Sequence, residues 1–147
     1  MNTVKDLVIH SPALRPIDYT QLWEVILAVD SSVIAVGFIL MQVRDDNKRY
    51  PSRFGSIAWN ERESRYSQAK LELYSLFRAL HAFRIYIVGV KNFMVEVDAK
   101  YLKGMLNNPD VQPNATINRW IAGILLFDFT LWHIPATAHT AADRLSQ

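Results

Sequence analysis

The spacing of apolar residues constrains the fold of this chain most, because its period changes near residue 67. Before that point, WEVILAVDSSVIAVGFILMQV carries two β-branched runs separated around residues 30–32, which predicts two strands joined by a tight turn. Between residues 67 and 88, apolar side chains recur at steps of three and four, which predicts one face of a long helix ending at Gly89. The positions of this face are Ala69, Leu73, Leu76, Leu80, Phe83 and Ile87.

The remaining segments complete the pattern of an α/β domain. The polar stretch 45–48 predicts a turn, and RFGSIAW predicts a third strand. NFMVEVD predicts a buried strand, and the long helix before it favours a position parallel to the first strand. A short helix is expected at residues 100–106, a loop over NNPDVQPN, a helix at 117–127 and a last strand in TLWHIP. The sequence therefore predicts a mixed five-stranded sheet with helices packed on it.

Composition limits the kinds of site that the chain can form. Its 147 residues suit one domain, and the 16 basic against 14 acidic residues give a formal charge of +2. Binding to a polyanion would therefore need local clusters of cations. The absence of cysteine excludes disulfides and thiolate metal sites, so a metal would have oxygen or imidazole ligands. No apolar run approaches the ~18 residues of a membrane span and no signal peptide opens the chain, so an intracellular domain is expected.

Both ends of the chain are expected to connect to other domains. Residues 1–20 end in the proline-punctuated SPALRPIDYT, which predicts a connector from an upstream domain. Residues 21–147 are expected to form one domain, in which the final ADRLSQ begins a truncated helix.

Four acidic residues stand in unusually uncharged surroundings. Asp30 and Asp98 each follow an apolar strand, Glu72 lies beside the apolar helix face, and Asp143 lies near the end of the chain. Each alone has an ordinary explanation as a turn or helix cap, an exposed helix partner or a residue favoured by a helix dipole. Together they would repel one another, since like charges raise each other's pKa. A divalent cation would offset that repulsion, and oxygen-only ligands favour magnesium or manganese.

Several motifs in one order resemble the ribonuclease H domain of gypsy-type LTR retrotransposon polyproteins, notably those of fungi. They are ILAVDSS, FGSIAWNERESRYSQAKLELYSLFRAL, VEVDAKYLKGM, INRWIAGILLFDFTLWHIP and HTAADRLS, and they cover nearly the whole chain from residue 24. The resemblance implies a ribonuclease H-like fold, with a mixed five-stranded sheet and helices on both faces. It also implies cleavage of the RNA strand of RNA·DNA hybrids by two magnesium ions, for which manganese may substitute, leaving 5′-phosphate and 3′-hydroxyl ends. Asp30, Glu72, Asp98 and Asp143 would bind the metals.

The same resemblance indicates further residues and partners. Either His133 or His139 would assist proton or product departure, although a histidine at a strand end is more often structural. The expected partners are the hybrid, a reverse transcriptase and other domains of the same polyprotein, in a cytoplasmic retroelement particle or the nucleus. Arg144 directly after Asp143, and Gln147 in place of the usual arginine, depart from the family pattern. The expected nucleic-acid contacts are Ser31, Ser67, Gln68, Lys100, Lys103 and Arg119.

Other functions share parts of this pattern. A catalytically inactive ribonuclease H-like module could bind nucleic acid or a protein partner, but all four acids are present. An integrase or junction resolvase would space its acids differently, and YSQAKLELYSL argues against it. In a domesticated host protein the same surface would serve a protein partner, and metal-dependent hybrid cleavage separates that case from an active nuclease.

Overall fold

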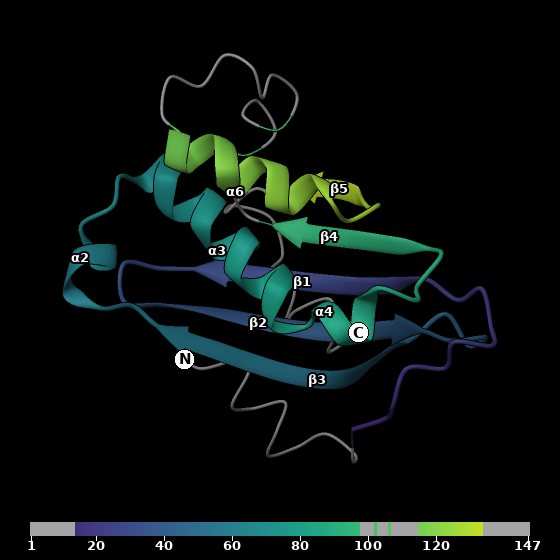
Figure 1. Cartoon of the computed structure of the whole chain (residues 1–147). Coiled ribbons are helices and arrows are strands. Elements are labelled where there is room, and N and C mark those ends of the chain that lie inside the picture. The colour runs from purple at the N-terminus through teal and green to yellow at the C-terminus, as the bar shows by residue number, and fades with distance from the viewer. Residues whose placement is uncertain (1–13, 98–101, 103–105, 107–114, 134–147) are drawn as a thin grey trace.

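A five-stranded mixed sheet forms the centre of the computed structural model, which describes residues 14–97, 102, 106 and 115–133. The strand order is β3-β2-β1-β4-β5 (Figure 1). β1 pairs antiparallel with β2 and parallel with β4, while β2–β3 is antiparallel and β4–β5 parallel. The predicted parallel pairing of the first and fourth strands is therefore confirmed. The strands are β1 (Val25–Ser31), β2 (Ala35–Val43), β3 (Arg49–Ala58), β4 (Phe93–Val97) and β5 (Thr130–His133).

Two strand boundaries differ from the sequence prediction. β1 continues through Asp30 and Ser31, so the turn lies at residues 32–34 rather than at 30–32. β3 begins at Arg49, four residues earlier than predicted, although it contains Pro51. A proline is tolerated there because β3 is an edge strand and its pairing shifts at Leu40/Met41, where a β-bulge accommodates the extra residue. The predicted polar turn between β2 and β3 is present, with Asn47 at a positive φ of 64°.

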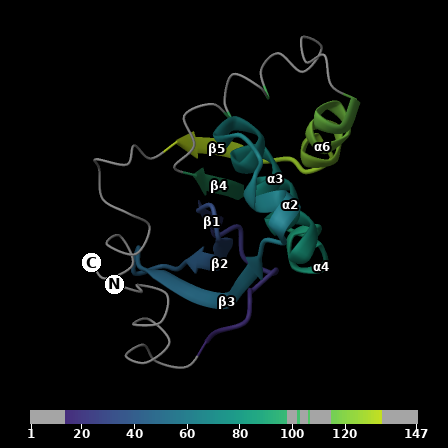
Figure 2. The same cartoon turned by 90° about the vertical axis from the view of Figure 1, so that its left-hand side faces the viewer.

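The described helices cover one face of the sheet, as Figure 2 shows. They are α2 (Glu61–Ser64), α3 (Gln68–Ala82), α4 (Arg84–Ile87) and α6 (Ala115–Leu125). The predicted helix 67–88 is thus divided at Phe83, which ends α3 and precedes α4. α6 begins and ends two residues earlier than predicted. Of the predicted helix 100–106, the structure describes only Leu102 and Leu106, which are both helical.

Successive side chains of a strand point to opposite faces of the sheet, and each face carries an apolar cluster. Leu27 and Val29 point toward the helices and join Leu73, Leu76 and Leu80 of α3 in the main core. Their neighbours in β1, Ile26 and Ala28, pack with Ile39 and Met41 on the other face. This two-sided burial explains why β1 is a continuous apolar run rather than an alternating one.

A glycine in β3 makes room for an aromatic ring of the main core. Phe38 is 3% exposed, and its ring lies over Gly55. A Cβ atom at residue 55 would lie 2.3 Å from Phe38 Cε2. Gly55→Ala is therefore expected to lower the free energy of unfolding by about 1–3 kcal/mol through overpacking. Gly37→Ala is the matched control, because no heavy atom lies within 4 Å of its added Cβ; equal urea midpoints for both variants would contradict this account.

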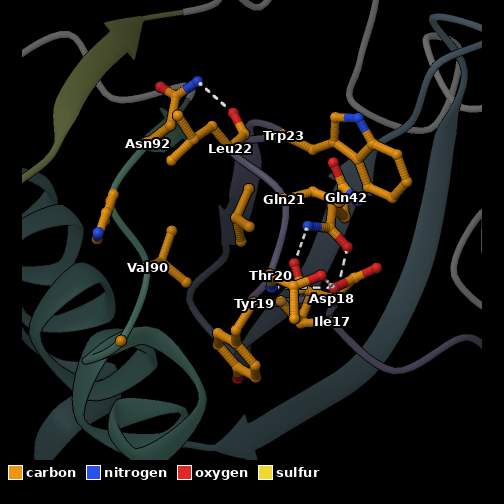
Figure 3. Close-up of a pocket in the computed structure, with 13 residues that line it drawn as sticks. Ile17, Asp18, Tyr19, Thr20, Gln21, Leu22, Trp23, Gln42, Val90 and Asn92 are labelled. Carbon is orange, nitrogen blue, oxygen red and sulfur yellow. Dashed lines mark hydrogen bonds between the residues drawn. The ribbon is translucent and has the colours of Figure 1, made fainter.

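The described part of the predicted connector packs against the domain (Figure 3). The buried Gln42 amide, 2% exposed, accepts from the Asp18 backbone N–H at 2.9 Å and donates to the Asp18 carbonyl at 3.0 Å. The Tyr19 hydroxyl donates to the Tyr86 carbonyl at 2.6 Å. A small cavity lies between this segment, Gln42 and residues 89–92. These bonds attach residues 18–19 to both β2 and α4.

Within the described residues, every helix is too short or too polar to cross a membrane.

Candidate active site

The carboxyl ends of β1, β4 and β5 lie at one edge of the sheet. The parallel register aligns Val29 with Val97, and Val97 with His133. The first turn of α3 lies on the same side of the molecule (Figure 1). Figure 2 shows the molecule from that side. In sheets with parallel strands, ligand sites form at such carboxyl ends.

Asp30 is the penultimate residue of β1, and its side chain is exposed. The apolar residues before Asp30 therefore do not bury it, because β1 leaves the core one residue earlier, at Val29. Asp30 pairs with Gly37 of β2, and by alternation it shares the face of Ile26 and Ala28. Its carboxylate is thus at the end of the sheet rather than beneath a helix.

Glu72 is buried in the first half of α3, with 5% of its surface exposed. The Gln68 side-chain amide, one turn earlier, donates to Glu72 Oε2 at 3.2 Å. Ser67 is the N-cap of α3, and its hydroxyl accepts from the Lys70 N–H at 3.3 Å. Ser67 and Gln68, predicted to contact nucleic acid, therefore contribute to capping the helix and orienting Glu72.

Several predicted site residues fall outside the described residues. They are Asp98, Lys100, Lys103, His139 and Asp143. Among the residues that the structure does describe, no group of three or more histidine, aspartate or glutamate side chains is gathered to hold a metal. Two of the four predicted ligands, Asp30 and Glu72, lie within this described part.

The other predicted residues occupy different parts of the domain. Ser31 ends β1 next to Asp30. The backbone of His133 ends β5, in register with Val97. Arg119 is exposed on α6. Its neighbour Trp120 belongs to the core: it is 7% exposed, and its ring lies 4.6 Å from the Tyr74 ring, centroid to centroid.

A polar network that the sequence interpretation missed fastens α2 to α3. Asn60 and Glu63 form a capping box, with the Asn60 N–H donating to Glu63 Oε1 at 3.0 Å. The Tyr74 hydroxyl donates to Glu63 Oε2 at 2.6 Å and accepts from Arg78 Nη1 at 2.7 Å. The Asn-x-x-Glu spacing before α3 is a recognisable start signal for a helix and would have revealed α2.

This network changes the pKa values of both acidic groups. Burial raises the pKa of the Glu63 carboxyl, but hydrogen bonds from Asn60 and Tyr74 and the Arg78 charge lower it more, so its net pKa is lowered. Burial, together with the bond to Glu63, raises the pKa of the Tyr74 hydroxyl. A carboxyl with a lowered folded-state pKa stabilises the fold above its unfolded pKa and loses that effect as pH falls through the folded pKa.

Tyr74→Phe is expected to lower the stability of the fold, and the difference from the parent should be larger at neutral pH than in acid. Removing the donor to a charged, buried acceptor should lower the free energy of unfolding by about 1.5–3 kcal/mol near pH 7. The loss should shrink on acidification, because the parent then loses the same stabilisation. Urea unfolding of both proteins across the acidic range measures this difference, and a pH-independent difference would contradict it.

The donor set at this edge matches a hard divalent cation. Glu72 presents a carboxylate that is nearly excluded from water, and Asp30 presents a second one at the neighbouring strand end. A buried carboxylate is costly unless hydrogen-bonded, paired or metal-bound. Oxygen donors of this kind suit magnesium or manganese.

Comparison with known proteins identifies the family of the chain. Residues 23–127 match the model of the family described as "RNase H-like domain found in reverse transcriptase". The Tf2-3 and Tf2-4 transposon polyproteins of Schizosaccharomyces pombe are each 28% identical to this chain over 148 aligned residues, covering all of it. The chain spans only 11% of the length of these relatives.

Solved structures share the fold at low sequence identity. A foamy viral protease–reverse transcriptase in complex with double-stranded DNA matches 91% of this chain with a TM-score of 0.66 and 12% identity, over 23% of its own length. The RNase H1 of Halobacterium salinarum matches 83% of this chain and 89% of its own, with a TM-score of 0.53 and 15% identity. The expected ribonuclease H-like fold is thus confirmed. The chain belongs to the family of RNase H-like domains found in reverse transcriptase.

Proposed function

We propose that this domain hydrolyses the RNA strand of RNA·DNA hybrids during reverse transcription of a retrotransposon, using two divalent metal ions. The observation that carries the proposal is the buried Glu72 carboxylate on α3, on the side of the sheet where β1, with Asp30 as its penultimate residue, ends. Membership of the RNase H-like family supports a nuclease. One relative of the same fold is a foamy viral protease–reverse transcriptase in complex with an RNA/DNA hybrid, with a TM-score of 0.55 and 17% identity.

Asp30 and Glu72, with Asp98 and Asp143, would hold the metal ions. When bound, magnesium lowers the pKa of the attacking water and stabilises the leaving oxygen. Gln68 holds one oxygen of Glu72 through its amide and so restricts the carboxylate to one orientation. Such partners of metal ligands fix the geometry in which the ligands meet the ion.

Hybrid recognition would use the strand end beside Asp30. Double-stranded nucleic acids with A-like geometry expose 2′-hydroxyls in a wide, shallow minor groove. Ser31, a small polar residue at the end of β1, is suited to such a contact. Arg119 is exposed on α6, and Lys100 and Lys103 follow β4 in the chain; they would neutralise phosphates and make binding salt-dependent.

A cleavage assay tests the proposal directly. A labelled RNA·DNA hybrid is incubated with the protein and magnesium, manganese or EDTA, with duplex DNA and duplex RNA as controls. Cuts in the RNA strand of the hybrid alone, and only with metal, are expected. A folded protein that binds the hybrid without cutting it would overturn the proposed activity in favour of a binding module.

A further inference from the structure

The turn that follows Asp30 is held by an indole from a different strand. Trp59, directly after β3, donates its Nε1–H to the Ser32 carbonyl at 2.9 Å. Its backbone N–H donates to the Ile34 carbonyl, also at 2.9 Å. Within the turn, the Ser32 hydroxyl accepts from the N–H groups of Ile34 and Ala35 at 3.2 Å each. The turn is therefore fixed both internally and to Trp59.

The same indole also contacts the helix that carries Glu72. The Trp59 ring lies 5.4 Å from the Tyr74 ring, centroid to centroid, and Tyr74 is two residues after Glu72 on α3. Tyr74 is itself held by hydrogen bonds to Glu63 and Arg78 and by the Trp120 ring. Trp59 thus joins the turn after β1 to a part of α3 that further contacts hold in place.

From these contacts we infer that Trp59 is a positioning residue for the metal site, because it fixes the spacing between Asp30 and Glu72. This inference rests on the proposed function. Asp30 lies two residues before the carbonyl that Trp59 binds, at the point where β1 leaves the core. Asp30 and Glu72 lie on different elements, so a link between those elements limits how far the two carboxylates can move apart. Among the described side chains, only Trp59 both donates a hydrogen bond to this turn from another strand's end and packs its ring against Tyr74.

The test compares Trp59→Phe with Trp23→Phe in the whole chain. Both substitutions remove one indole hydrogen bond, but Trp23 donates to Asp45 at 2.8 Å, in the β2–β3 turn rather than the β1–β2 turn. Two measurements that do not need cleavage are amide hydrogen exchange at Ser32 and Ala35 and manganese binding followed by electron paramagnetic resonance. Trp59→Phe is expected to accelerate exchange at both amides and to weaken manganese binding, each by roughly threefold to tenfold, the equivalent of one net hydrogen bond. Trp23→Phe should leave both values unchanged.

A second variant, Trp59→Leu, also removes the ring contact with Tyr74 and should enlarge both effects. Parental exchange rates in the turn of a folded Trp59→Leu protein would overturn the inference. Faster amide exchange with an unchanged manganese affinity would also overturn the inference, because the turn would then have no influence on the metal site. If the parent bound no manganese, or if Glu72→Gln bound it as well as the parent, the proposed metal site would fail. If the metal site failed but amide exchange was still faster in the Trp59 variants, the contact of Trp59 with the turn would stand and only the proposed function would be lost.

Discussion

Glu72→Gln is expected to reduce metal-dependent cleavage of an RNA·DNA hybrid by more than roughly 100-fold, since losing even a partner of a metal ligand typically costs 10- to 100-fold. The substitution keeps the shape of the side chain, but it removes the negative charge and replaces one carboxylate oxygen by an NH2 group that cannot bind the ion. Glutamine is nearly isosteric, so the core around Leu73 and Leu76 should remain packed. Initial rates of cleavage in saturating magnesium, together with thermal unfolding, measure the two effects separately.

Glu61→Gln is the matched control, because it makes the same chemical change on an exposed side chain of the neighbouring α2 helix. Its cleavage rate should equal that of the parent. Comparable rates in Glu72→Gln and Glu61→Gln, with both proteins folded, would show that Glu72 is not part of the catalytic metal site.

Arg49→Met is expected to destabilise the fold by about 3–5 kcal/mol, because it removes a positive charge and two hydrogen bonds from a buried carboxylate. Arg49 on β3 reaches Glu96 on β4 through two parallel hydrogen bonds of 2.8 Å each, and the Glu96 side chain is 1% exposed. Removing one member of a buried pair costs more than the pair itself contributes, since the remaining charge is still dehydrated. Urea unfolding near neutral pH measures the change.

Two comparisons test this explanation. The double variant Arg49→Met, Glu96→Met replaces both charges by apolar side chains and should recover much of the lost stability. Arg65→Met breaks the exposed pair with Glu61, whose side chains are 74% and 82% exposed, and should cost well under about 1 kcal/mol. Equal losses for Arg49→Met and the double variant would show that the loss of the Arg49 charge beside Glu96 is not the cause.

Apolar periodicity predicted the sheet and its long helix well, because both depend on burial that the sequence displays directly. β1 is a continuous apolar run and β4 is interrupted only by Glu96, so both strands were clear in the sequence, and the intervening helix implied their parallel pairing. The predicted ends of the strands were less accurate where contacts with neighbouring strands outweigh the local preferences of the residues. The third strand was predicted to begin at Arg53, yet β3 begins at Arg49, because a bulge in an edge strand accommodates Pro51.

The candidate site was predicted less completely than the fold. Glu72 was placed beside the apolar helix face, with an exposed helix partner as the alternative, and its 5% exposure favours the first position. The exposure of Asp30 was not predicted, since apolar residues before an acid do not show where the strand leaves the core. The roles of Trp59 and of the Glu63–Tyr74–Arg78 network depend on contacts between distant segments, which spacing along the chain does not encode. The metal-binding roles of the four acids remain predictions.

The outer edge of β3 also has a consequence for self-association. An exposed edge strand can template pairing with another copy of the same chain, and uninterrupted backbone donors make that easier. Here Pro51 removes one donor, the bulge disturbs the pairing pattern, and the Pro51 carbonyl already accepts from the Arg15 N–H at 3.1 Å. Strand-to-strand polymerisation through β3 is therefore disfavoured, so the protein should resist fibril formation along this edge even at high concentration.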